Sequence, residues 1–383
     1  MSAGDVLPVE VAGAAAEGDR HARPEGTVCH FWYGRQALGL MTSATVCSNA
    51  YIVEGALGAL PTVALIHPSG AELVVALRGA TALAWRAPWA IGSVGREVRD
   101  LLDGYEAESE LLAQEATRSG LMFPFANRIA AGAYTFDGAT HHVPPAPGEI
   151  GTLHGFVRLQ DWDVVPDGDV DGPADGAVSA TLATCVRSTD VAGYPFDLET
   201  RIRFELTEQT LDVTWSYRNV GQVAAPVTAG WHPYFRLPGH ATIDALELHV
   251  PARATVATDA RLIPLDGEAA REVRDAVGPL GLAGTVLDTA FTDLVPDVDG
   301  LVRTRVLDPA TGAGVEVWQE RGNMHVYTGD GLGARARTSI ALEPVESLTN
   351  AFNRPDCAQQ VRLEPGEKRE FRFGARVVAP REG

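Results

Sequence analysis

Hydrophobic and polar residues alternate with a period of two through several segments of the chain. Residues 201–206 (RIRFEL), 210–220 (TLDVTWSYRNV) and 370–378 (EFRFGARVV) each place apolar side chains at every second position. A strand with this pattern buries one face and exposes the other, which is typical of antiparallel sheets with one solvated side. The three segments therefore predict β-strands that cover a common core.

Turn signals agree with this interpretation. Asp137 and Gly138 separate two alternating runs in AYTF-DG-ATHHV, and an Asp-Gly pair favours a tight hairpin because both turn positions need positive φ. The 40 glycines and 24 prolines are spread along the whole chain. Only residues 96–116, which contain two leucine pairs, predict a short helix. We predict an all-β fold, a large antiparallel β-sandwich with few short helices.

Composition and charge narrow the possible functions. The formal net charge of −19 argues against a surface that neutralises phosphates, so no nucleic-acid partner is expected. No apolar run reaches the roughly 18 residues of a membrane span, and no secretory leader is recognisable, so we expect no membrane partner and a cytoplasmic location. Residues 1–25 show no hydrophobic periodicity, so we predict that they form a disordered tail. The single lysine, Lys368, argues against Schiff-base chemistry.

The sequence gives no reason to expect a metal or a cofactor. Residues 167–176 (DGDVDGPADG) begin like a calcium loop, but Val178 stands at the twelfth position, where a glutamate should close the shell. No zinc-protease or serine-hydrolase motif is present. The widely spaced cysteines predict reduced thiols, with a Cys29–Cys47 disulfide as the alternative; they are Cys29, Cys47, Cys185 and Cys357.

Four segments place a titratable side chain inside apolar, strand-like sequence. The segments are FPFANRI with Arg128, LHGF with His154, HPYF with His232 and LEPVESLTNAFN with Glu343. A buried charge without a partner costs several kcal/mol or more, so such groups have either a structural partner or a chemical task. Each alone fits a structural role, and the set of four favours a shared site.

In their order, these four segments resemble the aldose 1-epimerase (galactose mutarotase) family. The resemblance runs from about residue 58 to the C-terminus, so we predict a mutarotase-like domain over residues 58–383 and an unplaced N-terminal extension over residues 26–57. It implies a galactose mutarotase-like supersandwich. It also implies a cytoplasmic enzyme, an isomerase of carbohydrate metabolism, that interconverts the α and β anomers of a free aldose such as glucose or galactose without a cofactor.

The resemblance also implies roles for individual residues. Glu343 matches the family's general base and His232 its general acid. Ring opening of a hemiacetal needs both, because the C1 hydroxyl loses a proton while the ring oxygen gains one. A neighbouring carboxylate, Asp288 or Glu343, is expected to keep His232 protonated. The residues that match substrate-binding positions are Arg128, His154, Asp288 and Asn127.

Other functions on the same fold stay open at this point. One is a non-catalytic carbohydrate-binding or regulatory protein. A second is a glycoside hydrolase or lyase that uses Glu343 and Asp288 as a carboxylate pair. A third is an epimerase for a phosphorylated or otherwise modified sugar, which needs extra arginines at the pocket mouth; candidates are Arg158, Arg236 and Arg354. The partner is in each case a carbohydrate, and the sequence pattern selects neither the sugar nor the oligomeric state.

Overall fold

A computed structural model describes most of the chain after its first 50 residues. The chain divides into two compact units, residues 1–37 and 38–383, and every described residue belongs to the second. The predicted tail over residues 1–25, most of the extension over residues 26–57 and residues 168–175 of the acidic segment lie outside the described residues. The described ranges are 51–91, 95–146, 148–149, 151–167, 176–274 and 278–381.

A nine-stranded antiparallel sheet contains the three segments with the clearest alternation. In β14, buried and partly exposed residues alternate along almost the whole strand, and β13 follows the same pattern. This confirms the prediction from periodicity. In spatial order the strands are β11 (Asp163–Val165), β12 (Val178–Val186), β13 (Leu198–Leu206), β14 (Thr210–Asn219), β28 (Lys368–Val378), β24 (Gly314–Gln319), β23 (Val302–Leu307), β18 (Glu247–His249) and β21 (Leu280–Gly281).

An eight-stranded sheet forms part of the opposite layer. Its central strands are short and almost fully buried; all six residues of β26 are buried, for example. In spatial order the strands are β20 (Arg271–Val273), β19 (Ala252–Val256), β22 (Asp288–Leu294), β25 (Asn323–Tyr327), β26 (Ile340–Val345), β16 (Gly230–His232) and β6 (Gly120–Met122), with β17 (Tyr234–Phe235) also pairing to β26.

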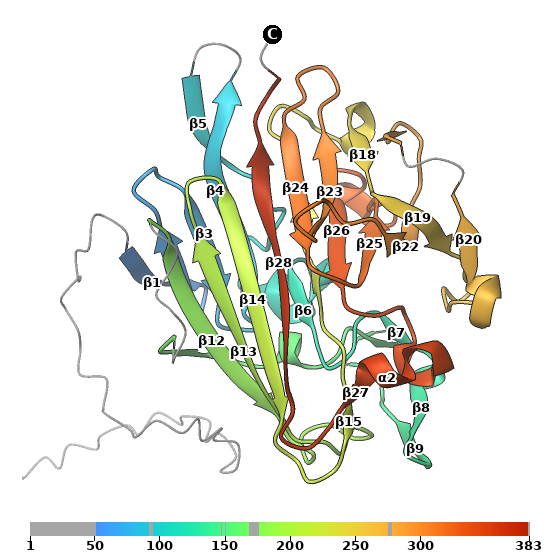
Figure 1. The fold of residues 1–383 in the computed structure, drawn as a ribbon. Coiled ribbons are helices and arrows are strands. Elements are labelled where there is room, and N and C mark those ends of the chain that lie inside the picture. The colour runs from blue at the N-terminus through green and yellow to red at the C-terminus, as the bar shows by residue number, and fades with distance from the viewer. Residues whose placement is uncertain are drawn as a thin grey trace, which may run out of the picture. The chain divides into compact units, whose positions relative to one another are not determined.

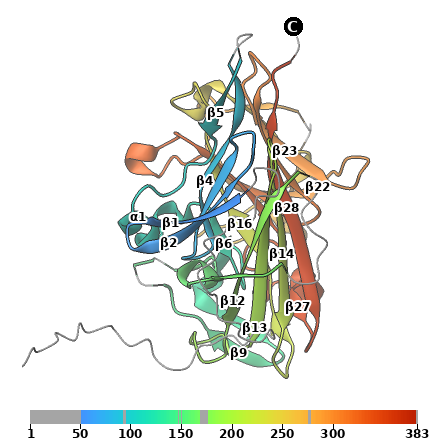
Figure 2. The same cartoon turned by 90° about the vertical axis from the view of Figure 1, so that its left-hand side faces the viewer.

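A five-stranded meander near the N-terminal end of the described chain forms a third sheet. Figure 2 shows it beside the strands of the nine-stranded sheet. Residues 51–57, which belong to the N-terminal extension in the sequence analysis, form its edge strand. The strands are β1 (Tyr51–Leu57), β2 (Leu60–Ile66), β3 (Glu72–Ala76), β4 (Thr81–Ile91) and β5 (Gly95–Asp100).

Aromatic side chains join the layers in one continuous core. Phe123, just after β6, lies 5.6 Å from Trp215 of β14, measured between ring centroids. Trp231 of β16 stacks on Phe373 of β28, also at 5.6 Å. Both contacts link the eight-stranded sheet to the nine-stranded sheet, whose long strands β14 and β28 cross the centre of Figure 1. The predicted antiparallel β-sandwich is therefore confirmed.

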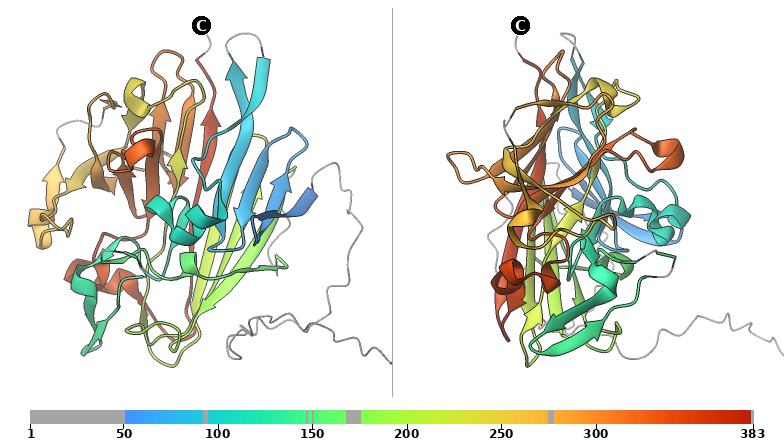
Figure 3. Two further views of the ribbon diagram at one scale, coloured as in Figure 1. Left: turned by 180° about the vertical axis from the view of Figure 1, so that it is seen from behind. Right: turned by 90° about the vertical axis from the view of Figure 1, so that its right-hand side faces the viewer.

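Short elements occupy the connections, as the views in Figure 3 show. The predicted hairpin at Asp137–Gly138 is confirmed, since both residues have positive φ. The short helix expected within residues 96–116 is confirmed at its second leucine pair, as α1 (Glu108–Ala113), whereas the first part of the segment pairs with β4 as β5. These elements are β8 (Ala133–Phe136), β9 (Ala139–His142), β7 (Arg128–Ile129), β10 (Thr152–Leu153), β15 (Ala225–Pro226), β27 (Arg362–Leu363), α1 (Glu108–Ala113), α2 (Ala358–Val361) and several 3₁₀ turns.

Two further expectations concern the thiols and the membrane. Cys357 is a free, buried cysteine, as expected. Cys185 is disulfide-bonded, so the expectation of a reduced thiol was wrong there. Cys29 and Cys47 lie outside the described residues. Within the described ranges, no helix is both long enough and apolar enough to span a membrane.

Candidate active site

Residues from distant parts of the sequence meet on the eight-stranded sheet. Asp288 begins β22, His232 ends β16, and Glu343 lies in the middle of β26. The order β22–β25–β26–β16 places these strands side by side. Arg128 lies in β7, which pairs with β10, and His154 directly follows β10. Ring and charge contacts described below connect this pair of strands to the sheet.

Glu343 and His232 form the closest pair of these titratable groups. The Nε2 atom of His232 lies 3.3 Å from Oε1 of Glu343. Glu343 is 1% exposed and His232 is 7% exposed. The imidazole of His232 stacks on Tyr234, and the imidazole of His154 meets it edge-on with ring centroids 5.3 Å apart. Packing on two sides thus fixes the ring of His232 against the carboxyl group.

Burial shifts the pKa values of both His232 and Glu343. Loss of solvation lowers the pKa of His232 to about 3, and the nearby charge of His325 acts in the same direction. Loss of solvation also raises the pKa of Glu343 to about 8, against the opposing charge of His325. At neutral pH these shifts favour a neutral imidazole beside a protonated carboxyl. The expectation that a neighbouring carboxylate keeps His232 protonated was wrong, because desolvation outweighs that attraction.

His325, which the sequence analysis missed, pairs with Asp288 in this site. It lies in β25, and its Nε2 atom is 2.9 Å from Oδ1 of Asp288. Burial alone would lower the pKa of His325, but the negative charge of Glu343 when it is ionised, together with the hydrogen bond and charge of Asp288, outweighs burial and raises the pKa above the ordinary value. Asp288 in turn has a lowered pKa: burial is outweighed by the hydrogen bond and charge of His325. Flanked by Met324 and Val326, His325 shows the same sequence signal as the other candidates.

Asn127 and Arg128 form a tight turn beside this group. Asn127 has a φ of 58°, its Oδ1 accepts the Arg128 backbone N–H at 2.8 Å, and its carbonyl accepts the His154 N–H at 3.0 Å. The backbone carbonyl of Asn127 therefore joins the FPFANRI segment to the LHGF segment, and its side-chain oxygen fixes the turn into Arg128. Among the described residues, the guanidinium of Arg128 has no ion-pair partner, which leaves its donors available to a ligand. His154 is buried, and desolvation keeps its pKa well below the ordinary value, so its ring is neutral.

The three arginines expected at the mouth of a pocket for a modified sugar are engaged elsewhere. Arg158 is fully buried and pairs with Glu149. Arg354 donates to the carbonyl of Leu265 and to Asp356. Arg236 pairs with Asp100 at 3.5 Å. None of them therefore adds a free positive charge beside Arg128.

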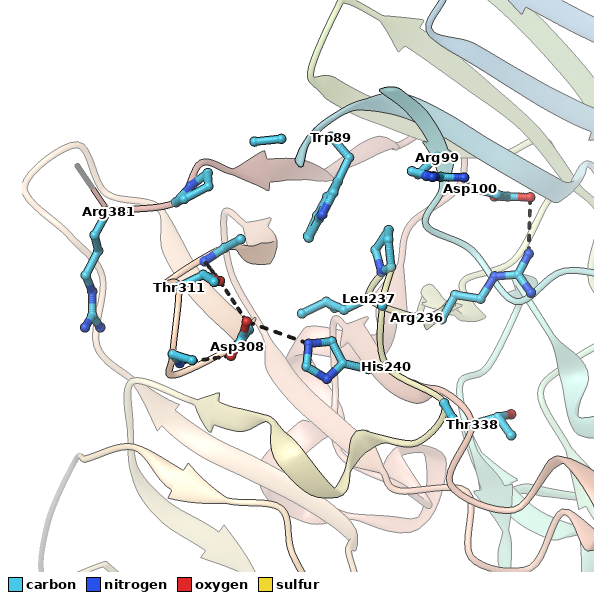
Figure 4. A pocket seen from close by; sticks show the side chains of 17 residues that line it. Trp89, Arg99, Asp100, Arg236, Leu237, His240, Asp308, Thr311, Thr338 and Arg381 are labelled. Carbon is cyan, nitrogen blue, oxygen red and sulfur yellow. Dashed lines mark hydrogen bonds and ion pairs between the residues drawn. The ribbon is translucent and has the colours of Figure 1, made fainter. Parts of the chain in front are cut away.

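Arg236 borders a separate cavity of about 1310 Å³, shown in Figure 4. His240 and Asp308 face each other there with 3.7 Å between Nε2 and Oδ2. Trp89 forms part of its wall. The predicted catalytic and sugar-binding residues do not line this cavity, so we do not assign the proposed reaction to it; they are Asn127, Arg128, His154, His232, Asp288 and Glu343.

The arrangement suits proton transfer at a small polar molecule. A carboxyl group and an imidazole lie 3.3 Å apart, and a histidine–carboxylate pair and a free guanidinium lie nearby. Groups of this kind can remove one proton and deliver another within the same site. Among the described residues, no group of three or more His, Cys, Asp or Glu side chains could hold a metal ion.

Comparisons with known proteins agree with this description. The model of the family "Aldose 1-epimerase" matches residues 61–376. The uncharacterized protein YihR of Escherichia coli K12 is 26% identical over 237 residues, which is 61% of this chain and 71% of that protein. The aldose 1-epimerase of the same organism is 29% identical over 205 residues, 52% of this chain and 55% of that protein. The match thus spans about half the length of that epimerase.

A solved structure of a GalM/aldose epimerase homologue from C. elegans shares the fold. Its TM-score is 0.70 at 19% identity, and the match covers 85% of this chain and 99% of that one. At this identity the likeness concerns the fold alone. The family model extends over most of the sequence, including all the site residues described above. The chain therefore belongs to the aldose 1-epimerase family.

Proposed function

We propose that this protein is an aldose 1-epimerase, an isomerase that interconverts the α and β anomers of a free aldose such as glucose or galactose. The observation that supports the proposal most directly is the buried contact of 3.3 Å between His232 and Glu343. The reaction needs one group that takes a proton and another that gives one, and this pair holds a single proton between them. Family membership supports the same chemistry.

The protonation states available to His232 and Glu343 fit both the complex with the cyclic sugar and the open-chain intermediate. In the sugar complex, the proton moves from Glu343 to His232, so that a carboxylate and an imidazolium face the substrate. Glu343 then takes the proton of the C1 hydroxyl, His232 donates its proton to the ring oxygen, and the bond between C1 and the ring oxygen breaks. Rotation about the C1–C2 bond of the resulting aldehyde and the reverse transfers close the ring as the other anomer.

The open-chain stage leaves Glu343 protonated and His232 neutral. Burial favours this same protonation of Glu343 and His232 in the free protein. The environment of the pair is therefore suited to the intermediate, and binding of the cyclic sugar must supply the free energy that separates the charges. Enzymes commonly use the binding energy of the substrate in this way to lower the barrier of the chemical step.

The remaining residues are assigned to substrate binding. Arg128 has its guanidinium available for forked hydrogen bonds to sugar hydroxyls. Asp288, with a side chain that is 41% exposed, can accept from a second hydroxyl. His154 packs against His232 and can offer a ring nitrogen. Asn127 is assigned to shaping the turn that carries Arg128.

Polarimetry tests the proposal. Freshly dissolved α-D-glucose or α-D-galactose should reach its equilibrium rotation faster with the protein present. Glu343→Gln and His232→Asn should each remove the acceleration, since one positioned proton transfer is typically worth ~10²- to 10⁴-fold in rate. His249→Asn is a matched control, because His249 also pairs with a carboxylate, Glu247, but in another sheet. Unchanged rates in both site variants would refute the mechanism. Sugar binding without acceleration would indicate a non-catalytic carbohydrate-binding protein.

A further inference from the structure

Three neighbouring strands arrange Asp288, His325 and Glu343 in a row. β25 lies between β22 and β26, and His325 is the direct cross-strand partner of Glu343. On its other side, His325 pairs in register with Ala290, two residues from Asp288, and contacts the Asp288 carboxylate at 2.9 Å. A single imidazole is thus placed between a buried carboxyl and a partly exposed carboxylate.

This row addresses a difficulty of the proposed reaction. Glu343 must be ionised to accept a proton, although it is 1% exposed. An ionised buried group without a counter-charge is strongly disfavoured. His232 supplies a counter-charge only while it is protonated, and burial lowers its pKa to about 3. A second cation directly opposite Glu343 therefore favours the ionised carboxylate.

We propose that His325, held by Asp288 and directly opposite Glu343, is a positioning residue that supplies the positive charge against which Glu343 ionises. The role of His325 in catalysis rests on the proposed function. Its effect on the ionisation of Glu343 is a property of the free protein and is testable without any substrate. Asp288 then has a second task beyond contact with a sugar, since it keeps the proton on His325.

The charges around the row support this assignment. His325 is the cation that lowers the pKa of Glu343, while Asp288 acts in the opposite direction. The Asp288 side chain is 41% exposed, so solvent weakens its repulsion, whereas His325 is 8% exposed. The other charged or titratable groups that act on His325 or are influenced by it are Arg128, His154 and His232.

Carboxyl NMR on the free protein tests the inference directly. With glutamate labelled at its side-chain carboxyl carbon, the Glu343 signal, identified by its absence in Glu343→Gln, is titrated in wild type and in His325→Gln. Glutamine keeps a donor for Asp288 but has no charge. Loss of the cation should raise the pKa of Glu343 by about one to two units at an effective dielectric near 20. His325→Asn should do the same, and His249→Gln should leave the signal unchanged.

Polarimetry supplies the second arm. In His325→Gln, the alkaline limit of activity should move to higher pH by the same amount. A rate that falls without a shift of this limit, together with an unchanged Glu343 titration, would overturn the inference and leave His325 a structural residue. If wild type accelerates no aldose, the proposed function fails, while a raised Glu343 pKa in the variant would still establish His325 as its counter-charge.

Discussion

At Glu343, burial opposes the ionisation that the chemistry requires. The carboxyl group lies within an apolar strand, and loss of solvation moves its pKa from 4.5 to about 8. The opposing charge of His325 offsets only part of that cost. Functional sites commonly hold groups whose ionisation the surroundings disfavour, and such groups reduce the stability of the fold.

This residue gives a stability prediction with a definite sign. The unfolded chain loses the proton of Glu343 near pH 4.5 and the folded chain near pH 8. The folded state thus binds more protons between these values, and its stability falls as the pH rises through the window. In Glu343→Gln this loss is absent. The unfolding free energy of the variant, relative to that of wild type, should rise by up to ~1.4 kcal/mol for each pH unit from 4.5 to 8.

Urea unfolding at several pH values measures this difference. Loss of catalysis together with a stability gain that grows with pH is the expected pattern. If the difference in unfolding free energy between variant and wild type stays constant from pH 5 to pH 8, the pKa of Glu343 is not raised by folding.

The identities of the site residues were easier to predict from sequence than their protonation. Arg128, His154, His232 and Glu343 each stood out as polar groups in apolar segments, and their order indicated the family. The charge state of His232 could not be predicted, because it depends on solvation that only the folded site determines. His325 gave the same local signal within NMHVY but had no matching motif.

At the scale of single elements, backbone contacts position the side chains of the candidate site. Gly155 follows His154 and has a φ of 65°. A Cβ atom at this position would lie 2.0 Å from the carbonyl oxygen of Phe123. Because Phe123 lies just before the turn that carries Arg128, the two strands can approach only with glycine here. The LHGF motif therefore includes its glycine for a steric reason.

Gly155→Ala should consequently impair both folding and chemistry. The substitution forces the loop away from Phe123, and a displacement near 1 Å in an active site can cost ~10²-fold in rate. We expect a loss of activity of at least tenfold and a lowered melting temperature, measured by polarimetry and calorimetry. Gly284→Ala is the matched control, because Gly284 has a similar φ of 68° but a Cβ atom there would have no neighbour within 4 Å. Equal behaviour of the two variants would contradict the steric argument.

Periodicity predicted the long strands because each buries only one face. The short helix expected within residues 96–116 is confirmed at Glu108–Ala113, which contains the second leucine pair. The first part of this segment, residues 95–100, pairs with β4 instead. A tertiary partner thus overrides local preference. The short strands β16, β25 and β26 gave no alternation, since almost all of their residues are buried, those on both faces included.

At the scale of the whole molecule, buried polar contacts tie the two layers together beside the site. Glu346, three residues after Glu343, accepts hydrogen bonds from the Tyr217 hydroxyl at 2.5 Å and from the Ala229 N–H at 2.9 Å. Arg321 pairs with its other oxygen at 2.6 Å. Tyr217 belongs to the nine-stranded sheet, so this carboxylate joins the two sheets through one buried network.

Removal of Glu346 should destabilise the entire sandwich. Glu346→Ala leaves the buried hydroxyl of Tyr217 and the buried N–H of Ala229 without their acceptor, and each such group costs roughly 1–3 kcal/mol, while Arg321 keeps its contacts with Glu320 and the Glu370 carbonyl. Chemical unfolding measures this loss. Glu370→Ala, an exposed glutamate of β28, should stay within about 0.5 kcal/mol of wild type. Similar losses in both variants would show that the network contributes little.

The pH dependence of anomer exchange tests the central claim most directly. After subtraction of the uncatalysed rate, kcat/KM of wild type should be sustained near neutrality and fall about tenfold per pH unit above about 8, as the His232–Glu343 pair loses its single proton. Glu343→Gln should show no acceleration at any pH. A catalysed rate that stays constant through pH 9.5, or persists in Glu343→Gln, would contradict proton transfer by this pair.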